Sequence, residues 1–191
     1  MAHLSIIGTG NMGQAIVAVA GNGGHTVQLL GENDTDTQVS GDIVVLAVPY
    51  PAVSAVIAQR GASLAGKIVV DITNPLNFET FDSLVVPADS SAAAEIAAAL
   101  PQSRVLKAFN TTFAGTIAAG TVGPLTTTVL IAGDDTDAKS TLADILTSGG
   151  LNAIDAGTLK RARELEAIGF LQLTLAANEK VSWTGGFGVA A

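Results

Sequence analysis

Short apolar runs alternate with stretches whose apolar residues recur at helical spacing along nearly the whole chain. The run Asp42-Ile43-Val44-Val45-Leu46-Ala47-Val48 is almost continuously apolar, which is typical of a strand buried on both faces of a parallel sheet. Glycine, proline, serine and aspartate mark the boundaries between these stretches. We expect strands at 3–7, 25–30, 42–48, 67–72, 104–109, 126–132 and 152–155. We expect helices at 14–20, 52–59, 90–100, 113–119, 134–146 and 160–181.

Strands that alternate with helices predict an α/β fold with a doubly wound, mostly parallel sheet. The polar segment between the strands at 25–30 and 42–48 is too short for a full crossover helix, so that helix should be missing or reduced to one turn. We expect residues 1–157 to form the sheet domain. Residues 158–191 should form a small helical lobe that packs on this domain or makes a dimer interface.

The first predicted strand runs into Gly8-Thr9-Gly10-Asn11-Met12-Gly13, which has the spacing Gly-x-Gly-x-x-Gly. Between a strand and a helix, Gly8 would permit a tight turn, Gly10 would let a pyrophosphate approach the backbone, and Gly13 would let the helix pack close to the strand. The helix N-terminus adds unpaired N–H groups and a partial positive charge. The motif therefore predicts dinucleotide binding on a Rossmann-type sheet, with a plain strand-to-helix turn as the alternative.

Ligands of doubly wound sheets bind outside the carboxyl ends of the strands, where the strand order reverses. This rule selects the loops at 8–13, 31–33, 48–51, 73–76 and 108–112. Asn74 and Asn110 place short hydrogen-bonding side chains in the last two loops, where a nicotinamide amide could be recognised. Asn-Pro and Asn-Thr sequences also favour ordinary turns, so both interpretations stay open.

Glu32 follows Gly13 by 19 residues, close to where dinucleotide-binding folds place an acid on the adenosine ribose. Its carboxylate would accept from the 2′-hydroxyl and repel a 2′-phosphate. No lysine or arginine occurs between Gly31 and Gln59 to bind such a phosphate, which favours NAD or loose discrimination between the two nucleotides. Alternatively, Glu32 belongs only to a solvated acidic loop.

Composition narrows the choice of function. The chain of 191 residues has a net charge of −8 and no basic run, which argues against nucleic acid and anionic membranes as partners. It contains no cysteine and only two histidines, so neither a disulfide nor a metal site is predicted. The first strand starts at His3, which leaves no room for a signal peptide, and no apolar segment reaches transmembrane length. We therefore expect a cytoplasmic protein.

No residues stand out as an acid–base couple or an activated nucleophile. Hydride transfer between two redox cofactors needs only alignment and exclusion of water, because the cofactors supply the chemistry. The basic cluster Lys160-Arg161-Ala162-Arg163 opens the last predicted helix, where cations oppose the helix dipole. The i,i+3 pairs Arg161–Glu164 and Arg163–Glu166 would offset this cost, and an anion-binding role for the cluster is the alternative.

Several segments at the predicted sheet edge and at the start of the last helix follow one another along the chain in this order: Gly8-Thr9-Gly10-Asn11-Met12-Gly13, Val48-Pro49-Tyr50-Pro51, Asp71-Ile72-Thr73-Asn74-Pro75-Leu76, Lys107-Ala108-Phe109-Asn110-Thr111, and Asp155-Ala156-Gly157 with Ala162-Arg163-Glu164-Leu165-Glu166. Together they resemble the coenzyme F-420-dependent (8-hydroxy-5-deazaflavin) NADP oxidoreductases and their bacterial dinucleotide-binding relatives. The resemblance implies a Rossmann domain with a small C-terminal lobe, and an enzyme that passes a hydride between NADP(H) and a deazaflavin stacked on the nicotinamide. A flavin or another flat acceptor is an alternative second substrate. A non-catalytic NAD(P)-binding sensor is the alternative function.

The resemblance also implies roles for individual residues. Thr9 to Met12 would hold the pyrophosphate, Val48 and Pro49 would border the nicotinamide, and the backbone near Ala108 would bind its carboxamide. Where the family has a small polar residue and an arginine after the second strand, this chain has Glu32 and Asn33. Cofactor contacts are expected at Gly8, Thr9, Gly10, Asn11, Met12, Gly13, Gly31, Glu32, Asn33, Ala47, Val48, Pro49, Asn74, Pro75, Ala108 and Asn110. The second substrate is expected at Tyr50, Leu76, Thr111, Gly185, Gly186 and Phe187, and a homodimer is expected to form through the last helix.

Overall fold

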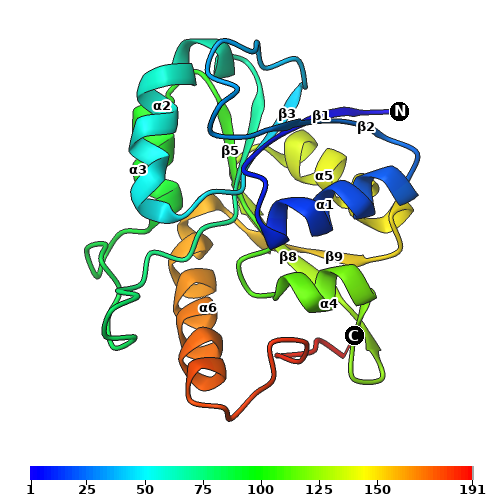
Figure 1. The fold of residues 1–191 in the computed structure, drawn as a ribbon, viewed down its shortest axis with the longest axis vertical. Helices are drawn as coiled ribbons and strands as arrows, with labels where there is room; N and C mark the ends of the chain where they lie inside the picture. Colours follow the sequence, from blue (N-terminus) through cyan, green and yellow to red (C-terminus); the bar gives the residue numbers. More distant parts are fainter. Residues whose placement is uncertain (191) are drawn as a thin grey trace.

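The computed structural model describes residues 1–190, which form a seven-stranded sheet with helices on both faces (Figure 1). The strands are β1 (His3–Ile7), β2 (Thr26–Leu30), β3 (Ile43–Leu46), β4 (Ile68–Asp71), β5 (Arg104–Lys107), β8 (Thr128–Gly133) and β9 (Asn152–Gly157), in the order β2-β1-β3-β4-β5-β8-β9. Strands β1 to β5 are parallel, β8 runs antiparallel to β5, and β9 is parallel to β8. The predicted α/β fold with a mostly parallel sheet is confirmed.

The central strands are apolar throughout because both of their faces are covered. Every residue of β3 and of β4 is buried. Successive side chains of a strand point to opposite faces. Val45 accordingly belongs to the core that includes residues of α1 and α5, whereas Val44 belongs to the core that includes residues of α2 and α3. This two-sided burial is what makes the sheet doubly wound.

Helices α1 to α5 divide between the two faces of the sheet. The helices are α1 (Asn11–Asn22), α2 (Tyr50–Leu64), α3 (Ala92–Ala99), α4 (Ala114–Ala119), α5 (Thr136–Ser148), the 3₁₀ turn η1 (Leu159–Arg161) and α6 (Ala162–Ala177). Helices α1, α4 and α5 contribute buried side chains to one core, and α2 and α3 contribute to the other. Figure 1 shows α2 and α3 on one side of the sheet and α1 and α5 on the other.

The order of the strands reverses at β1. The chain passes from β1 through α1 to β2 on one side, and then returns to place β3 on the other side of β1. The carboxyl ends of β1 and β3 therefore flank the crevice in which ligands of this architecture bind.

The connection between β2 and β3 contains no helix, as the sequence predicts. Its backbone is held instead by Arg60 of α2. The guanidinium donates from Nη1 to the Thr37 carbonyl oxygen at 2.7 Å and from Nη2 to the Asp34 carbonyl oxygen. A side chain from a neighbouring helix thus replaces the packing that a crossover helix would supply.

The last helix differs from the prediction at both ends. It begins at Ala162 rather than residue 160, because residues 159–161 form a 3₁₀ turn whose Leu159 N–H donates to Asp134 Oδ1 at 3.0 Å. It ends at Ala177 rather than residue 181, since Glu179 takes up a positive φ of 57° that terminates the helix. A small hairpin of β6 (Thr121–Val122) and β7 (Leu125–Thr126) was not predicted, because its strands are too short to produce an alternating pattern.

The predicted division at residue 157 falls at the end of β9, before η1. Whether residues 158–191 act as a separate lobe stays a prediction. Within residues 1–190, no helix is both long enough and apolar enough to cross a membrane.

Candidate functional site

Two cavities adjoin at the carboxyl ends of β1 and β3. The first, here called the main cavity, has a volume of about 650 Å³, and the second, the β2-side cavity, has a volume of about 460 Å³. They share the lining residues Gly10, Ala47, Val48 and Pro49. The two cavities therefore lie where ligands of doubly wound sheets bind, and the glycine loop lies between them.

Each glycine of the loop at residues 8–13 has its own geometric role. Gly8 has a φ of 122°, and an added Cβ would collide with the Ala47 carbonyl oxygen. A Cβ on Gly13 would collide with the Gly8 carbonyl oxygen, so this glycine allows α1 to pack against the turn. A Cβ on Gly10 would meet no atom within 4 Å. Gly8 and Gly13 are thus needed by the fold itself, whereas Gly10 opens onto empty space where a ligand can approach the backbone.

The N-terminus of α1 has properties that favour an anion. Gly10 is its N-cap, no side chain caps the first turn, and the first turn contains no acidic residue. The first N–H groups of a helix have no partner within the helix, and the helix dipole makes this end positive. A phosphate group bound here would satisfy both the donors and the charge.

Aromatic and amide side chains form the walls of the main cavity. Tyr50 comes from the start of α2, Phe109 and Asn110 from the loop after β5, and Trp183 from the C-terminal tail. The Trp183 ring lies 5.1 Å from the Phe113 ring, centroid to centroid. The cavity therefore has flat apolar surfaces beside a small number of polar groups, which suits a planar ligand.

Asn74 and Asn110 join the loops that follow β4 and β5. Asn74 Nδ2 donates to the Asn110 carbonyl oxygen at 2.9 Å, and Asn110 Nδ2 donates to Asn74 Oδ1 at 3.1 Å and to the Leu165 carbonyl oxygen at 2.8 Å. Helix α6 lies against this pair at Gly169, where an added Cβ would collide with Asn74 Oδ1. These hydrogen bonds hold the loops after β4 and β5 to each other and to the start of α6. Among residues 1–190, Asn110 Oδ1 and Thr73 Oγ1 are nevertheless buried without a hydrogen-bond partner.

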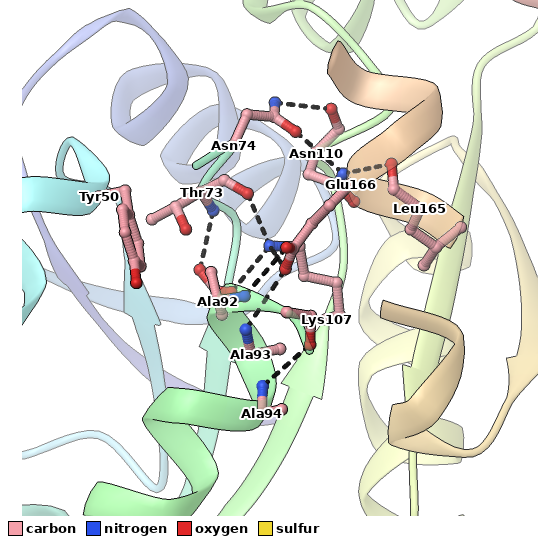
Figure 2. A network of polar contacts seen from close by, with 12 residues as sticks. Tyr50, Thr73, Asn74, Ala92, Ala93, Ala94, Lys107, Asn110, Leu165 and Glu166 are labelled. Atoms are coloured by element: carbon pink, nitrogen blue, oxygen red, sulfur yellow. Dashed lines mark hydrogen bonds and ion pairs between the residues drawn. The ribbon is translucent and has the colours of Figure 1, made fainter. Parts of the chain in front are cut away.

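A buried ionic cluster lies behind this wall. Lys107 Nζ lies 2.8 Å from Asp71 Oδ2, 2.8 Å from Glu166 Oε1 and 2.6 Å from the Thr73 carbonyl oxygen. The three charged side chains have exposed fractions of 0%, 0% and 1%. Figure 2 shows the Lys107 ammonium between the Glu166 carboxylate and the Thr73 backbone. Asp71 Oδ1 also accepts from the Thr73 N–H at 2.8 Å, so the backbone of this cavity residue is fixed from both sides.

Glu166 connects this cluster to α3. Its carboxylate accepts the Ala92 N–H at 2.9 Å and the Ala93 N–H at 3.3 Å, at the first turn of that helix (Figure 2). Burial raises the pKa of the Glu166 carboxyl above its ordinary value, while the Lys107 charge opposes this shift. The predicted ion pair between Arg163 and Glu166 is therefore wrong, because Glu166 points inward to Lys107 and not along the helix surface. The other predicted pair, Arg161–Glu164, is present at 3.5 Å.

Tyr50 is the one phenol in the main cavity, and its hydroxyl donates to Glu95 Oε2 on α3. Burial, followed by this hydrogen bond and the Glu95 charge, raises the pKa of Tyr50 well above its ordinary value. The phenol is therefore neutral at physiological pH, and it is a wall of the cavity and not a general base.

The β2-side cavity lies between the end of β2 and the outer part of α2. Its lining includes Gly31 and Glu32 from the loop after β2, and Arg60 from α2. The Asp34 carboxylate turns back toward the strand end, where Oδ2 accepts the Gly31 N–H at 2.7 Å. The cavity thus contains both acidic and basic side chains.

The structure brings most of the predicted site residues to these cavities. The main cavity is lined by Gly10, Asn11, Met12, Ala47, Val48, Pro49, Tyr50, Asn74 and Asn110 among others. The β2-side cavity adds Gly8, Thr9, Gly31 and Glu32.

Other predicted residues lie outside both linings. Ala108 is buried, and its N–H donates to the Asp71 carbonyl oxygen. Leu76 is buried as well and bridges to Leu84. The N–H of Phe187 donates to Gln172 Oε1 at 3.0 Å, which attaches the tail to α6, and Trp183 is the tail residue that lines the main cavity. The full set outside the linings is Gly13, Asn33, Pro75, Leu76, Ala108, Thr111, Gly185, Gly186 and Phe187.

Several lining residues were missed by the sequence reasoning. Phe109 carries a φ of 63°, a left-handed conformation that is strained for a residue with a side chain. No sequence pattern signals that conformation. Trp183 could have been found, because it is the only tryptophan in a chain with very few aromatic residues. Thr73 follows a predicted strand at the selected edge and was passed over for its neighbour Asn74.

Known proteins resemble the chain in both sequence and structure. The model of the family "NADP oxidoreductase coenzyme F420-dependent" matches residues 30–75. The F420-dependent NADP reductase of Methanocaldococcus jannaschii is 32% identical over 166 residues, which cover 85% of this chain and 74% of that relative. The enzyme of the same name from Methanothermobacter thermautotrophicus is 30% identical over 176 residues, covering 89% and 75%.

A solved structure shares the whole fold. The crystal structure of an Arthrobacter sp. FB24 protein assigned as an F420-dependent NADP reductase superposes with a TM-score of 0.87, covers 100% of both chains and is 23% identical. Identity at this level shows the fold alone, whereas the archaeal relatives match in sequence over most of their length. The chain belongs to the coenzyme F420-dependent NADP oxidoreductase family.

Proposed function

We propose that the protein is an oxidoreductase that transfers a hydride between NADP(H) and a deazaflavin of the F420 type. One observation carries this proposal: a cavity with flat aromatic walls adjoins a second cavity at the N-terminus of α1. Relatives named F420-dependent NADP reductases support the choice of both substrates.

The nucleotide would lie across both cavities. Its pyrophosphate would bind above Gly10 at the uncapped first turn of α1, where a Cβ would have no neighbour. The adenosine half would occupy the β2-side cavity beside Gly31 and Glu32. The nicotinamide would enter the main cavity past Val48 and Pro49, which line both cavities. Two adjoining cavities with shared lining residues support this placement of the nucleotide.

The chain's own residues would align the two reactants and exclude water. When both are bound, the nicotinamide and the deazaflavin would supply the donor and the acceptor of the hydride. Tyr50 and Trp183 line the main cavity and offer flat surfaces for stacking. The neutral Tyr50 phenol is consistent with a reaction that needs no protein acid or base.

The finer parts of the proposal concern assembly and location. We propose a homodimer formed through α6, because Ile168 and Leu171 on this helix are 37% and 51% exposed. A cytoplasmic location, as the sequence predicts, is part of the same proposal.

The test combines binding and turnover. Calorimetry should show that NADPH binds to the wild-type protein, and anaerobic mixing of NADPH with oxidised deazaflavin should bleach the deazaflavin absorbance. A sensor would instead bind nucleotide tightly without turnover of deazaflavin, flavin or ferric acceptors. Absence of binding to both NADPH and NADH would refute the proposal in either form.

A matched pair of glycine variants ties the result to the site. Gly10→Val should abolish nucleotide binding, because its side chain fills the space proposed for the pyrophosphate. Gly21→Val, at the far end of the same helix and equally free of neighbours, should bind as the wild type does. Equal binding by both variants would show that the pyrophosphate lies elsewhere.

A further inference from the structure

Arg60 is a buried cation in the wall of the β2-side cavity. It belongs to α2, its exposed fraction is 7%, and it lines the cavity together with Gly31 and Glu32. Charged side chains are rarely buried unless an opposite charge compensates them. The position of Arg60 thus raises the question of which anion it meets.

Within residues 1–190, the partners of this guanidinium are neutral. Nη1 and Nη2 donate to the carbonyl oxygens of Thr37 and Asp34, which uses two of the five N–H groups that an arginine carries. Across residues 1–190, Arg60 forms no ion pair with a carboxylate. A full positive charge and several N–H donors therefore remain available beside a cavity.

The acidic side chains nearest in sequence are turned elsewhere. Asp34 presents its backbone carbonyl to Arg60, while its carboxylate accepts the Gly31 N–H. Glu32 shares the cavity lining but forms no ion pair with Arg60. Neither acid therefore forms an ion pair that would neutralise the Arg60 guanidinium.

We propose that Arg60 is a specificity-determining residue that binds the 2′-phosphate of NADP. This inference rests on the proposed function, which puts the adenosine half in the β2-side cavity. The loop after β2 carries Asn33 and no cation of its own, and the fold brings the Arg60 guanidinium to this loop from α2. A guanidinium can form two parallel charge-assisted hydrogen bonds to a phosphate, and its planar donors give geometric selectivity.

Arg60→Gln tests this assignment, with Arg104→Gln as the matched control. Arg104 is an exposed arginine on β5 outside both cavity linings, so its replacement changes the net charge by the same amount. Loss of a charge-assisted bidentate contact should weaken NADPH binding roughly 10- to 100-fold, whereas NADH binding should change less than about twofold. Arg104→Gln should leave both affinities unchanged. Equal weakening of NADPH and NADH by Arg60→Gln would overturn the inference, since it would reduce Arg60 to an anchor of the loop.

Two further measurements keep the test decisive if Arg60→Gln fails to fold. The wild-type protein should bind 2′,5′-ADP at least about tenfold more tightly than 5′-AMP, because the two nucleotides differ only in the 2′-phosphate. Arg60→Lys, which keeps the charge but loses the fork of donors, should give an intermediate preference. Equal affinity of the wild type for 2′,5′-ADP and 5′-AMP would refute the inference. The proposed function would survive that result as long as NADPH or NADH binds and reacts.

Discussion

Removal of the ammonium from the buried ionic cluster provides a strong test of how this protein is held together. In Lys107→Met, the side chain keeps much of its length but leaves the Asp71 and Glu166 carboxylates without their shared cation. All three side chains are at most 1% exposed, so water cannot replace the lost partner. Breaking a buried ion pair by removing one partner typically costs about 3–5 kcal/mol. We expect Lys107→Met to lose free energy of unfolding in that range at neutral pH.

Urea denaturation followed by circular dichroism measures this loss. With a slope of about 3 kcal/mol/M, the expected cost lowers the midpoint by roughly 1–2 M. Burial favours protonation of the unpaired Glu166 carboxyl as the pH falls, so the difference from the wild type should shrink under acidic conditions.

Lys139→Met is the matched control. Lys139 Nζ lies 2.8 Å from Asp155 Oδ2, a distance equal to those in the buried cluster, but the Asp155 side chain is 55% exposed. Solvent screens such a pair, and its loss should cost less than about 1 kcal/mol. Equal destabilisation by the two variants would refute the argument that burial, and not the ion-pair distance, sets the energy of the Lys107 contacts.

Three more outcomes follow from the same structure. Gly8→Ala should lower the free energy of unfolding by at least about 2 kcal/mol in urea denaturation, because Gly8 has a φ of 122° and the added Cβ would collide with the Ala47 carbonyl oxygen. Stability close to that of the wild type would contradict this geometry. Tyr50→Phe should change the affinity for substrates but not the pH profile of hydride transfer from about pH 6 to 9, because the raised pKa keeps the Tyr50 phenol neutral. Loss of an ionisation from this profile would assign Tyr50 a role in proton transfer. The pKa of Glu166 is raised above its ordinary value of 4.5 in the folded protein, so between the unfolded and the folded pKa the folded protein binds more protons than the unfolded chain. This group therefore makes the free energy of unfolding fall as the pH rises between the two values. Glu166→Gln should remove this contribution, and an unchanged pH dependence of the urea midpoint would disprove it.

The sheet and the glycine loop were accessible from the sequence because local patterns encode them. A continuous apolar run such as 42–48 has no stable alternative to a strand covered on both faces. The glycines at 8, 10 and 13 have fixed spacing and a strand before them, and the structure gives each a geometric role. The missing helix between β2 and β3 could also be inferred, because the length of the connection limits what it can contain.

Interactions between distant residues were not accessible in the same way. Glu166 was expected to pair with Arg163 one helical turn away, yet it reaches Lys107 and the start of α3. Sequence spacing gives the neighbours of a residue on its own helix, but only the packing of α6 against the sheet decides which face is buried. Arg60 was overlooked for the same reason, since it is remote in sequence from the loop that it binds.

The contact between Glu166 and the first turn of α3 also bears on the order in which the chain folds. Glu166 lies 74 residues beyond Ala92, whereas Asp71 of β4 and Lys107 of β5 lie only 36 residues apart. Contacts between distant residues require the closure of long loops and tend to form after local ones. We therefore expect the parallel strands to assemble first, and α6 to dock and seal the charged cluster late. A substitution at Glu166 would then accelerate unfolding while leaving the folding rate nearly unchanged.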